Sequence, residues 1–141
     1  MAMKLKGTPL VPGATEGRLL VSSEPLSFWG GYDQYTGEVI DRRHPLSGTN
    51  GAGRVLAIPF TRGSSTTTAI LLESIRAGVA PAAILTRETD SFLALASIVA
   101  DEMYQRPLPV IALSPSDFDL LETGPHAVIQ ADGAIEIKDG G

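Results

Sequence analysis

Apolar and polar positions follow two different periods in the second half of the chain, and this pattern predicts a parallel sheet covered by helices. Short apolar runs typical of buried strands occupy residues 55–58, 82–86 and 109–113. Between these runs, apolar residues recur at helical spacing over about residues 67–77 and again from Asp90 onward. Strand–helix–strand connections of this length favour neighbouring parallel strands with right-handed crossovers.

The other segments carry shorter strand signals. Residues 126–130 and 134–138 flank the turn sequence Ala131-Asp132-Gly133, which favours a β-hairpin. Residues 18–22 form an apolar run that predicts a strand, and residues 38–40 predict a shorter one. We therefore expect an α/β fold whose mixed sheet has parallel core strands and an antiparallel edge hairpin.

The composition is that of a single globular domain spanning residues 1–141. Hydrophobic residues make up 43% of the chain and charged residues 19%, which is enough apolar material for a core without disulfides. The 15 glycines and 10 prolines indicate many tight turns. Residues 25–36, with their glycine, proline and aromatic content, and residues 48–53, rich in small residues, are expected to be structured loops.

Charge and residue types exclude several kinds of partner. The net charge is −5, so we expect no nucleic-acid partner. We also expect a cytoplasmic location and no membrane, because the start of the chain does not resemble a signal peptide and no apolar run could span a bilayer. Without cysteine, only His44 and His126 remain as imidazole ligands, and we expect this chain to bind no metal.

Hydroxyl side chains gather where a predicted strand leads into a predicted helix, in the sequence RGSSTT at residues 62–67. A helix N-terminus has unpaired N–H groups and a partial positive charge, which can hold a carboxylate or phosphate and favour an ionised hydroxyl. Serine and threonine are also good N-caps, and Gly63 can serve only to permit the turn. The pattern alone leaves both interpretations open.

Two familiar catalytic patterns are missing around this turn. It lacks the lysine of a Walker motif, so nucleotide binding has little support. Ser64 lacks the second glycine of a G-x-S-x-G elbow, and His126 lies in a predicted hairpin strand, where it is a weak partner for a nucleophile. Serine hydrolase activity is therefore poorly supported.

Two further segments carry side chains that can serve function. His44 lies in the polar run DRRHP at residues 41–45, which predicts a surface loop, a subunit contact or a loop that faces substrate. Trp29 follows Phe28 and precedes two glycines, and such an aromatic residue is more often a core or interface anchor than a platform for a ligand.

Five segments together resemble the small subunit of the aconitase X family, and the resemblance extends from about Gly7 to Lys138. They are EPLSFWGG (residues 24–31), IDRRHPL (40–46), GRVL (53–56), RGSS (62–65) and APAAI (80–84). The resemblance implies the swivelling β/β/α domain of aconitases, joined to a large subunit that holds an iron–sulfur cluster. The activities of the family are dehydrations, of cis-3-hydroxy-L-proline in bacteria and of mevalonate 5-phosphate in archaea.

The same resemblance implies roles for the residues of the turn. Ser64 would accept a proton, as an alkoxide stabilised by the helix N-terminus and by cations such as Arg62. Arg62, Gly63, Ser65 and Thr66 would bind the acid group of the substrate. In aconitases proper an arginine follows the paired serines, whereas Thr66 stands here, so that role would pass to Arg62 or to the large subunit.

The sequence therefore predicts the small subunit of a hydro-lyase, inactive alone, that contacts its large subunit through Phe28, Trp29 and His44. The composition, rich in alanine and arginine, favours cis-3-hydroxy-L-proline as the substrate. Mevalonate 5-phosphate is the alternative substrate. A non-catalytic swivelling or docking module is the alternative of another class.

Overall fold

The computed structural model describes residues 2–62, 65–106 and 108–138, and within these residues eight strands form one mixed sheet. Its centre consists of four parallel neighbours, in the order β3 (Thr15–Val21), β5 (Val55–Ala57), β7 (Ala83–Thr86) and β8 (Val110–Ala112). The apolar runs of the sequence are thus buried strands, and the predicted parallel pairing is confirmed.

Antiparallel strands extend this sheet on both sides. The hairpin of β9 (His126–Ile129) and β10 (Ala134–Lys138) pairs with β3, as the turn sequence predicted. Strand β1 (Ala2–Lys6) then pairs with β10, so the hairpin is not the last element on its side. Strand β2 (Thr8–Val11) pairs with β8 at the opposite end of the sheet.

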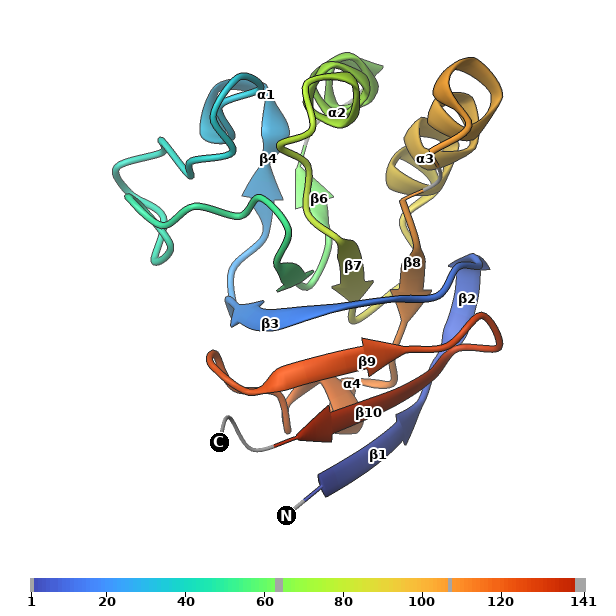
Figure 1. Cartoon of the computed structure of the whole chain (residues 1–141). Helices are drawn as coiled ribbons and strands as arrows, with labels where there is room; N and C mark the ends of the chain where they lie inside the picture. The colour runs from blue at the N-terminus through green and yellow to red at the C-terminus, as the bar shows by residue number, and fades with distance from the viewer. Residues whose placement is uncertain (1, 63–64, 107, 139–141) are drawn as a thin grey trace.

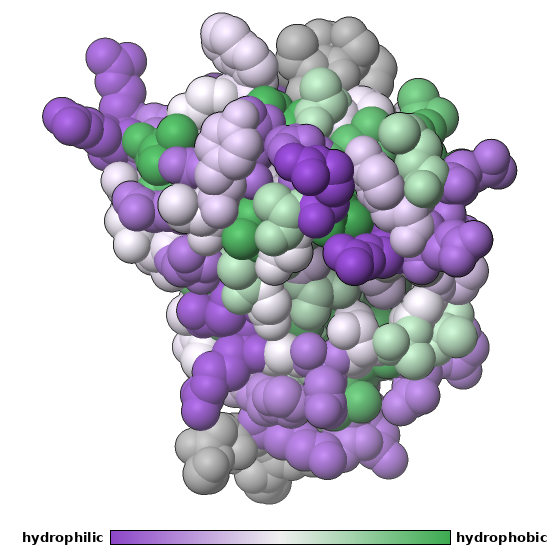
Figure 2. All heavy atoms as spheres, turned by 45° about the horizontal axis from the view of Figure 1, so that its top comes forward, coloured by the Kyte–Doolittle hydropathy of each residue, from purple (hydrophilic) through white to green (hydrophobic). Residues whose placement is uncertain are grey.

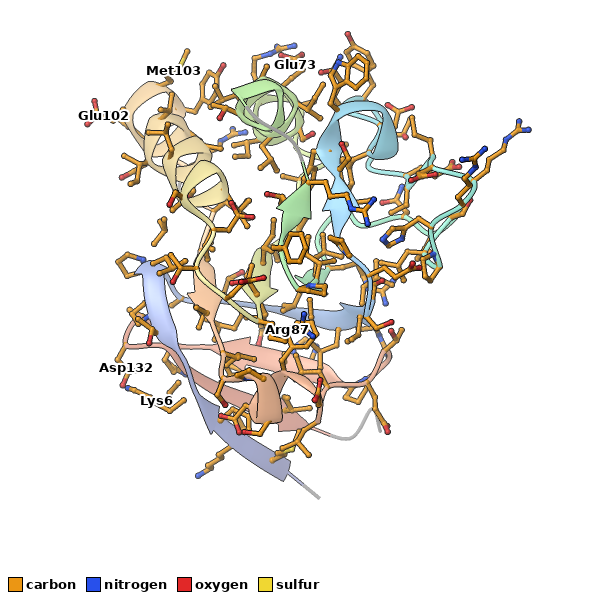
Figure 3. All side chains as sticks on the ribbon, turned by 180° about the vertical axis from the view of Figure 1, so that it is seen from behind. Lys6, Glu73, Arg87, Glu102, Met103 and Asp132 are labelled. Carbon is orange, nitrogen blue, oxygen red and sulfur yellow. The ribbon has the colours of Figure 1, made fainter. Side chains whose placement is uncertain are left out.

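The sheet curls towards a barrel because β1 and β2 are consecutive in the chain but lie at its two ends (Figure 1). Gly7 joins them, and its N–H donates to the carbonyl oxygen of Gly133 at 2.9 Å. A Cβ on Gly7 would lie 2.3 Å from Cγ2 of Ile111, so only glycine fits at this bend. Close by, Lys6 and Asp132 form an ion pair of 3.0 Å, visible in Figure 3.

Two apolar clusters lie on opposite faces of the central strands. Helices α2 (Ser65–Arg76) and α3 (Ser91–Tyr104) pack together on one face, as Figure 1 shows, and close the first cluster. The second cluster fills the curved side of the sheet. The adjacent residues Ile84 and Leu85 of β7 belong to different clusters, as the alternation of side chains along a strand requires.

Four further short elements were not predicted by the sequence. The expected loop at residues 25–36 contains strand β4 (Leu26–Ser27) and the single helical turn α1 (Phe28–Gly31). Strand β6 (Thr61–Arg62) pairs with β4 in parallel, and α4 (Pro115–Phe118) lies behind the β9–β10 hairpin in Figure 1. The predicted strand at residues 38–40 is wrong, because Glu38 and Val39 make only isolated bridges.

Candidate functional site

The β4–β6 pair brings Arg62, the first residue of the RGSSTT segment, next to the aromatic segment. Thr61 and Arg62 lie opposite Leu26 and Ser27, so the chain enters the turn beside the start of α1. Helix α2 begins at Ser65, two residues before the predicted start, and Thr66 belongs to its first turn. Ser64 and Gly63, the predicted base and its neighbour, lie outside the described residues.

Asp90 links the start of β6 to the start of α3. One carboxylate oxygen of this buried residue accepts the backbone N–H of Thr61 at 2.7 Å and also the Thr61 hydroxyl. The other oxygen caps α3 by accepting the N–H of Leu93 at 3.0 Å. The sequence predicted the helix start near Asp90, but its bonds to Thr61 cross 29 positions and leave no local signal.

A cavity of about 560 Å³ lies beside Arg62, and it is the place where two segments of the predicted site meet. The loop at residues 41–44 lines it together with Arg62 and with the segment before β4. Three arginines and two carboxylates therefore face one cavity, an arrangement that suits a small ligand with charged groups. The complete lining is Glu24, Pro25, Asp41, Arg42, Arg43, His44 and Arg62.

His44 is a buried wall residue of this cavity, with 8% of its surface exposed. Its Nδ1 accepts the backbone N–H of Leu46 at 3.1 Å, which places the proton of the neutral ring on Nε2. Within the described part of the chain, the buried Nε2 has no hydrogen-bond partner. His44 is thus a buried residue in a loop whose neighbouring arginines, Arg42 and Arg43, are exposed.

The two predicted aromatic contacts differ in exposure. Phe28 is fully buried and packs on Tyr32 with ring centroids 5.1 Å apart. Trp29 is 65% exposed and, with the exposed Tyr35 and Ile40, borders a hollow of about 330 Å³. Figure 2, which turns the helices towards the reader, shows apolar patches separated by polar side chains on the helical face of the molecule.

The donor set of this chain does not suit an iron–sulfur cluster. The sequence has no cysteine, so it offers no thiolate ligand. Within residues 2–62, 65–106 and 108–138, no group of three or more histidine, aspartate or glutamate side chains is close enough to hold a metal ion. In the same residues, no helix combines the length and the apolar content needed to cross a membrane.

Comparison with known proteins places the whole fold in one family. The family model described as the aconitase X swivel domain matches residues 4–137. The crystal structure of Thermococcus kodakaraensis aconitase X in its holo form is similar, with a TM-score of 0.85 and 33% identity over 96% of this chain and 98% of that chain.

Two named relatives differ in length. The cis-3-hydroxy-L-proline dehydratase of Pseudomonas aeruginosa is 52% identical over 128 residues, which cover 91% of this chain but only 22% of that protein. The phosphomevalonate dehydratase small subunit of Thermococcus gammatolerans is 37% identical over 98% of this chain and 100% of its own length. The chain thus spans about a fifth of the first relative and all of the second.

Proposed function

The chain belongs to the aconitase X swivel-domain family, and on that premise we propose that it is the small subunit of a hydro-lyase that dehydrates a hydroxy acid. Both kinds of relative are named dehydratases. A large aconitase X subunit is the proposed partner, because one relative is about four times as long as this chain and the other is itself called a small subunit. The iron–sulfur cluster of the complex is assigned to that large subunit.

cis-3-Hydroxy-L-proline is the proposed substrate, and the observation that carries this choice is the 52% identity to the Pseudomonas dehydratase, against 37% to the Thermococcus subunit. The charges of the cavity agree with it. Hydroxyproline is a zwitterion, so its carboxylate can meet the arginines while its ammonium group meets Glu24 or Asp41. Mevalonate 5-phosphate carries only negative charges and would gain nothing from these two carboxylates.

Ser64 is the proposed proton acceptor. Its neighbours in sequence support the role. Arg62, two residues before Ser64, lines the cavity, and α2 begins at Ser65, the residue after it. The first N–H groups of a twelve-residue helix and a guanidinium group would favour an alkoxide once the large subunit excludes water. Ser65, Thr66 and the Gly63 backbone are the proposed donors to the substrate carboxylate.

Trp29 is the proposed contact with the large subunit. An exposed tryptophan beside a hollow is typical of an interface anchor. The position of Trp29 also fits, since Ser27, two residues earlier, pairs with Arg62 at the entrance to the serine turn. Docking at Trp29 would therefore cover the side of the domain on which Arg62 lies.

Ser64→Ala in the complex with the large subunit tests the catalytic proposal. The variant complex should assemble normally and lose about 100-fold or more in kcat, the usual contribution of a general base. Ser91→Ala is the matched control, because Ser91 is an exposed serine at the first position of α3, and this variant should keep the wild-type kcat. Turnover by Ser64→Ala above about a tenth of wild type would favour the docking-module alternative.

A further inference from the structure

His44 lines the cavity and combines three properties: its side chain is buried, its neutral tautomer is fixed by one hydrogen bond, and its Nε2 has no hydrogen-bond partner. The ring is held by a single described bond, from the Leu46 N–H to Nδ1. This bond uses the acceptor nitrogen, so the remaining nitrogen, Nε2, carries the hydrogen in the neutral ring. A buried donor without an acceptor is costly, and native proteins rarely leave one unmade unless a ligand completes it.

The surroundings of His44 indicate what kind of group would complete the bond. Arg42, Arg43 and Arg62 line the same cavity, so an anionic oxygen is attracted there. Glu24 and Asp41 also line the cavity, but Asp41 already accepts the backbone N–H of Arg43 at 3.0 Å. A substrate carboxylate is both an acceptor for Nε2–H and a partner for the guanidinium groups.

We propose that His44 is a substrate-binding residue whose Nε2–H donates to the carboxylate of the hydroxy acid in this cavity. The proposal rests on the dehydratase function proposed above and assigns to this loop a role in ground-state binding. The loop geometry supports it. The His44 N–H donates to the Asp41 carbonyl at 3.1 Å, and Ser47 N–H donates to the His44 carbonyl at 3.0 Å, so the backbone on both sides of the ring is held.

Two substitutions separate the two nitrogens of the ring. His44→Asn keeps an acceptor near the Nδ1 position for the Leu46 N–H but removes the Nε2 donor. His44→Gln does the reverse, since its amide nitrogen reaches the Nε2 position while the acceptor for Leu46 is lost. If His44 only braces its loop, the asparagine variant should resemble wild type and the glutamine variant should be the impaired one.

The experiment measures KM, kcat and complex assembly for wild type and both variants, with the large subunit and with cis-3-hydroxy-L-proline and mevalonate 5-phosphate as substrates. On the substrate that wild type dehydrates, we expect His44→Asn to raise KM about tenfold or more, the usual effect of losing a hydrogen bond to a charged group, with kcat changed far less. His44→Gln should recover most of the wild-type KM.

The other possible results of this experiment contradict either the assignment of His44 or the proposed dehydratase function. An unchanged KM in His44→Asn, or weaker assembly with the large subunit and no change in KM, overturns the assignment of His44 and leaves the dehydratase function standing. The same holds if His44→Gln raises KM more than His44→Asn does. A wild-type complex that dehydrates neither compound overturns the proposed function, and the assignment of His44 with it.

Discussion

Replacing Asp90 by alanine should destabilise this chain more than the loss of an ordinary helix cap would. The carboxylate accepts two N–H groups and one hydroxyl from two separate elements, and it is only 7% exposed. In the alanine variant, α3 loses its cap at Leu93, and both donors of Thr61 lose their acceptor. The substitution therefore removes the two hydrogen bonds that link β6 to the start of α3.

The magnitude follows from the individual bonds. Replacing an N-cap residue by alanine costs about 0.5–2 kcal/mol. Each hydrogen bond to a charged group contributes about 1.5–3 kcal/mol net, and Thr61 makes two such bonds to the same oxygen of Asp90. Because bonds that share an oxygen are not additive, we expect a total loss of about 3–5 kcal/mol in the free energy of unfolding.

Urea denaturation followed by far-ultraviolet circular dichroism measures this loss, with Ser114→Ala as the matched control. Ser114 caps α4 through one exposed bond, from the Asp117 N–H at 3.2 Å, and its loss should cost about 1 kcal/mol. Asp90→Asn should fall between the two, because one amide oxygen can serve Leu93 or Thr61 but not both. A cost for Asp90→Ala no larger than that for Ser114→Ala would refute the reasoning.

Two other predictions concern aromatic side chains. Burial raises the pKa of Tyr32 well above its ordinary value of about 10, so the folded state loses stability as the pH rises above that value. In urea titrations, Tyr32→Phe should reduce this alkaline loss of stability and cost about 1 kcal/mol at pH 7, because the bond to the Val79 carbonyl is lost. An unchanged dependence of stability on alkaline pH would contradict the argument. Trp29→Ala should raise the Kd for the large subunit, measured by calorimetry, about 30-fold without changing the stability of the isolated chain. The control Leu95→Ala, at a residue 52% exposed on α3, should leave this Kd unchanged, and equal effects of both variants would rule out the proposed contact.

The core of the fold was predictable because its strands are buried on both sides. Continuous apolar runs such as residues 55–58 and 82–86 have few alternatives in a chain of this length, and the intervening helical spacing fixes their parallel order. Elements of two to four residues, such as β4 and α1, carry no periodicity, so their existence depends on tertiary pairing.

The N-terminal strands show a signal that sequence reasoning left unused. Met3 and Leu5 alternate with Lys4 and Lys6, and this is the pattern of the half-buried strand β1. The next strand contains Pro9, which is tolerated because β2 is an edge strand. Neither pattern reveals that the two strands close opposite ends of one sheet.

The candidate site was predictable in its parts but not in its assembly. The serine turn and the DRRHP loop were both singled out, yet nothing local indicated that Arg62 and His44 would line one cavity. A polar run of this kind is typical of a solvated loop, yet the His44 ring is buried and accepts the Leu46 N–H. Burial of a single polar side chain depends on packing that the pattern does not contain.

The rate at which the complex of this chain with a large aconitase X subunit dehydrates cis-3-hydroxy-L-proline and mevalonate 5-phosphate, measured side by side, tests the central claim most directly. The account predicts turnover of hydroxyproline at a kcat/KM at least tenfold above that for mevalonate 5-phosphate, a preference worth about 1.4 kcal/mol in the transition state. Turnover of mevalonate 5-phosphate alone would contradict the substrate choice, and turnover of neither compound would contradict the proposed function.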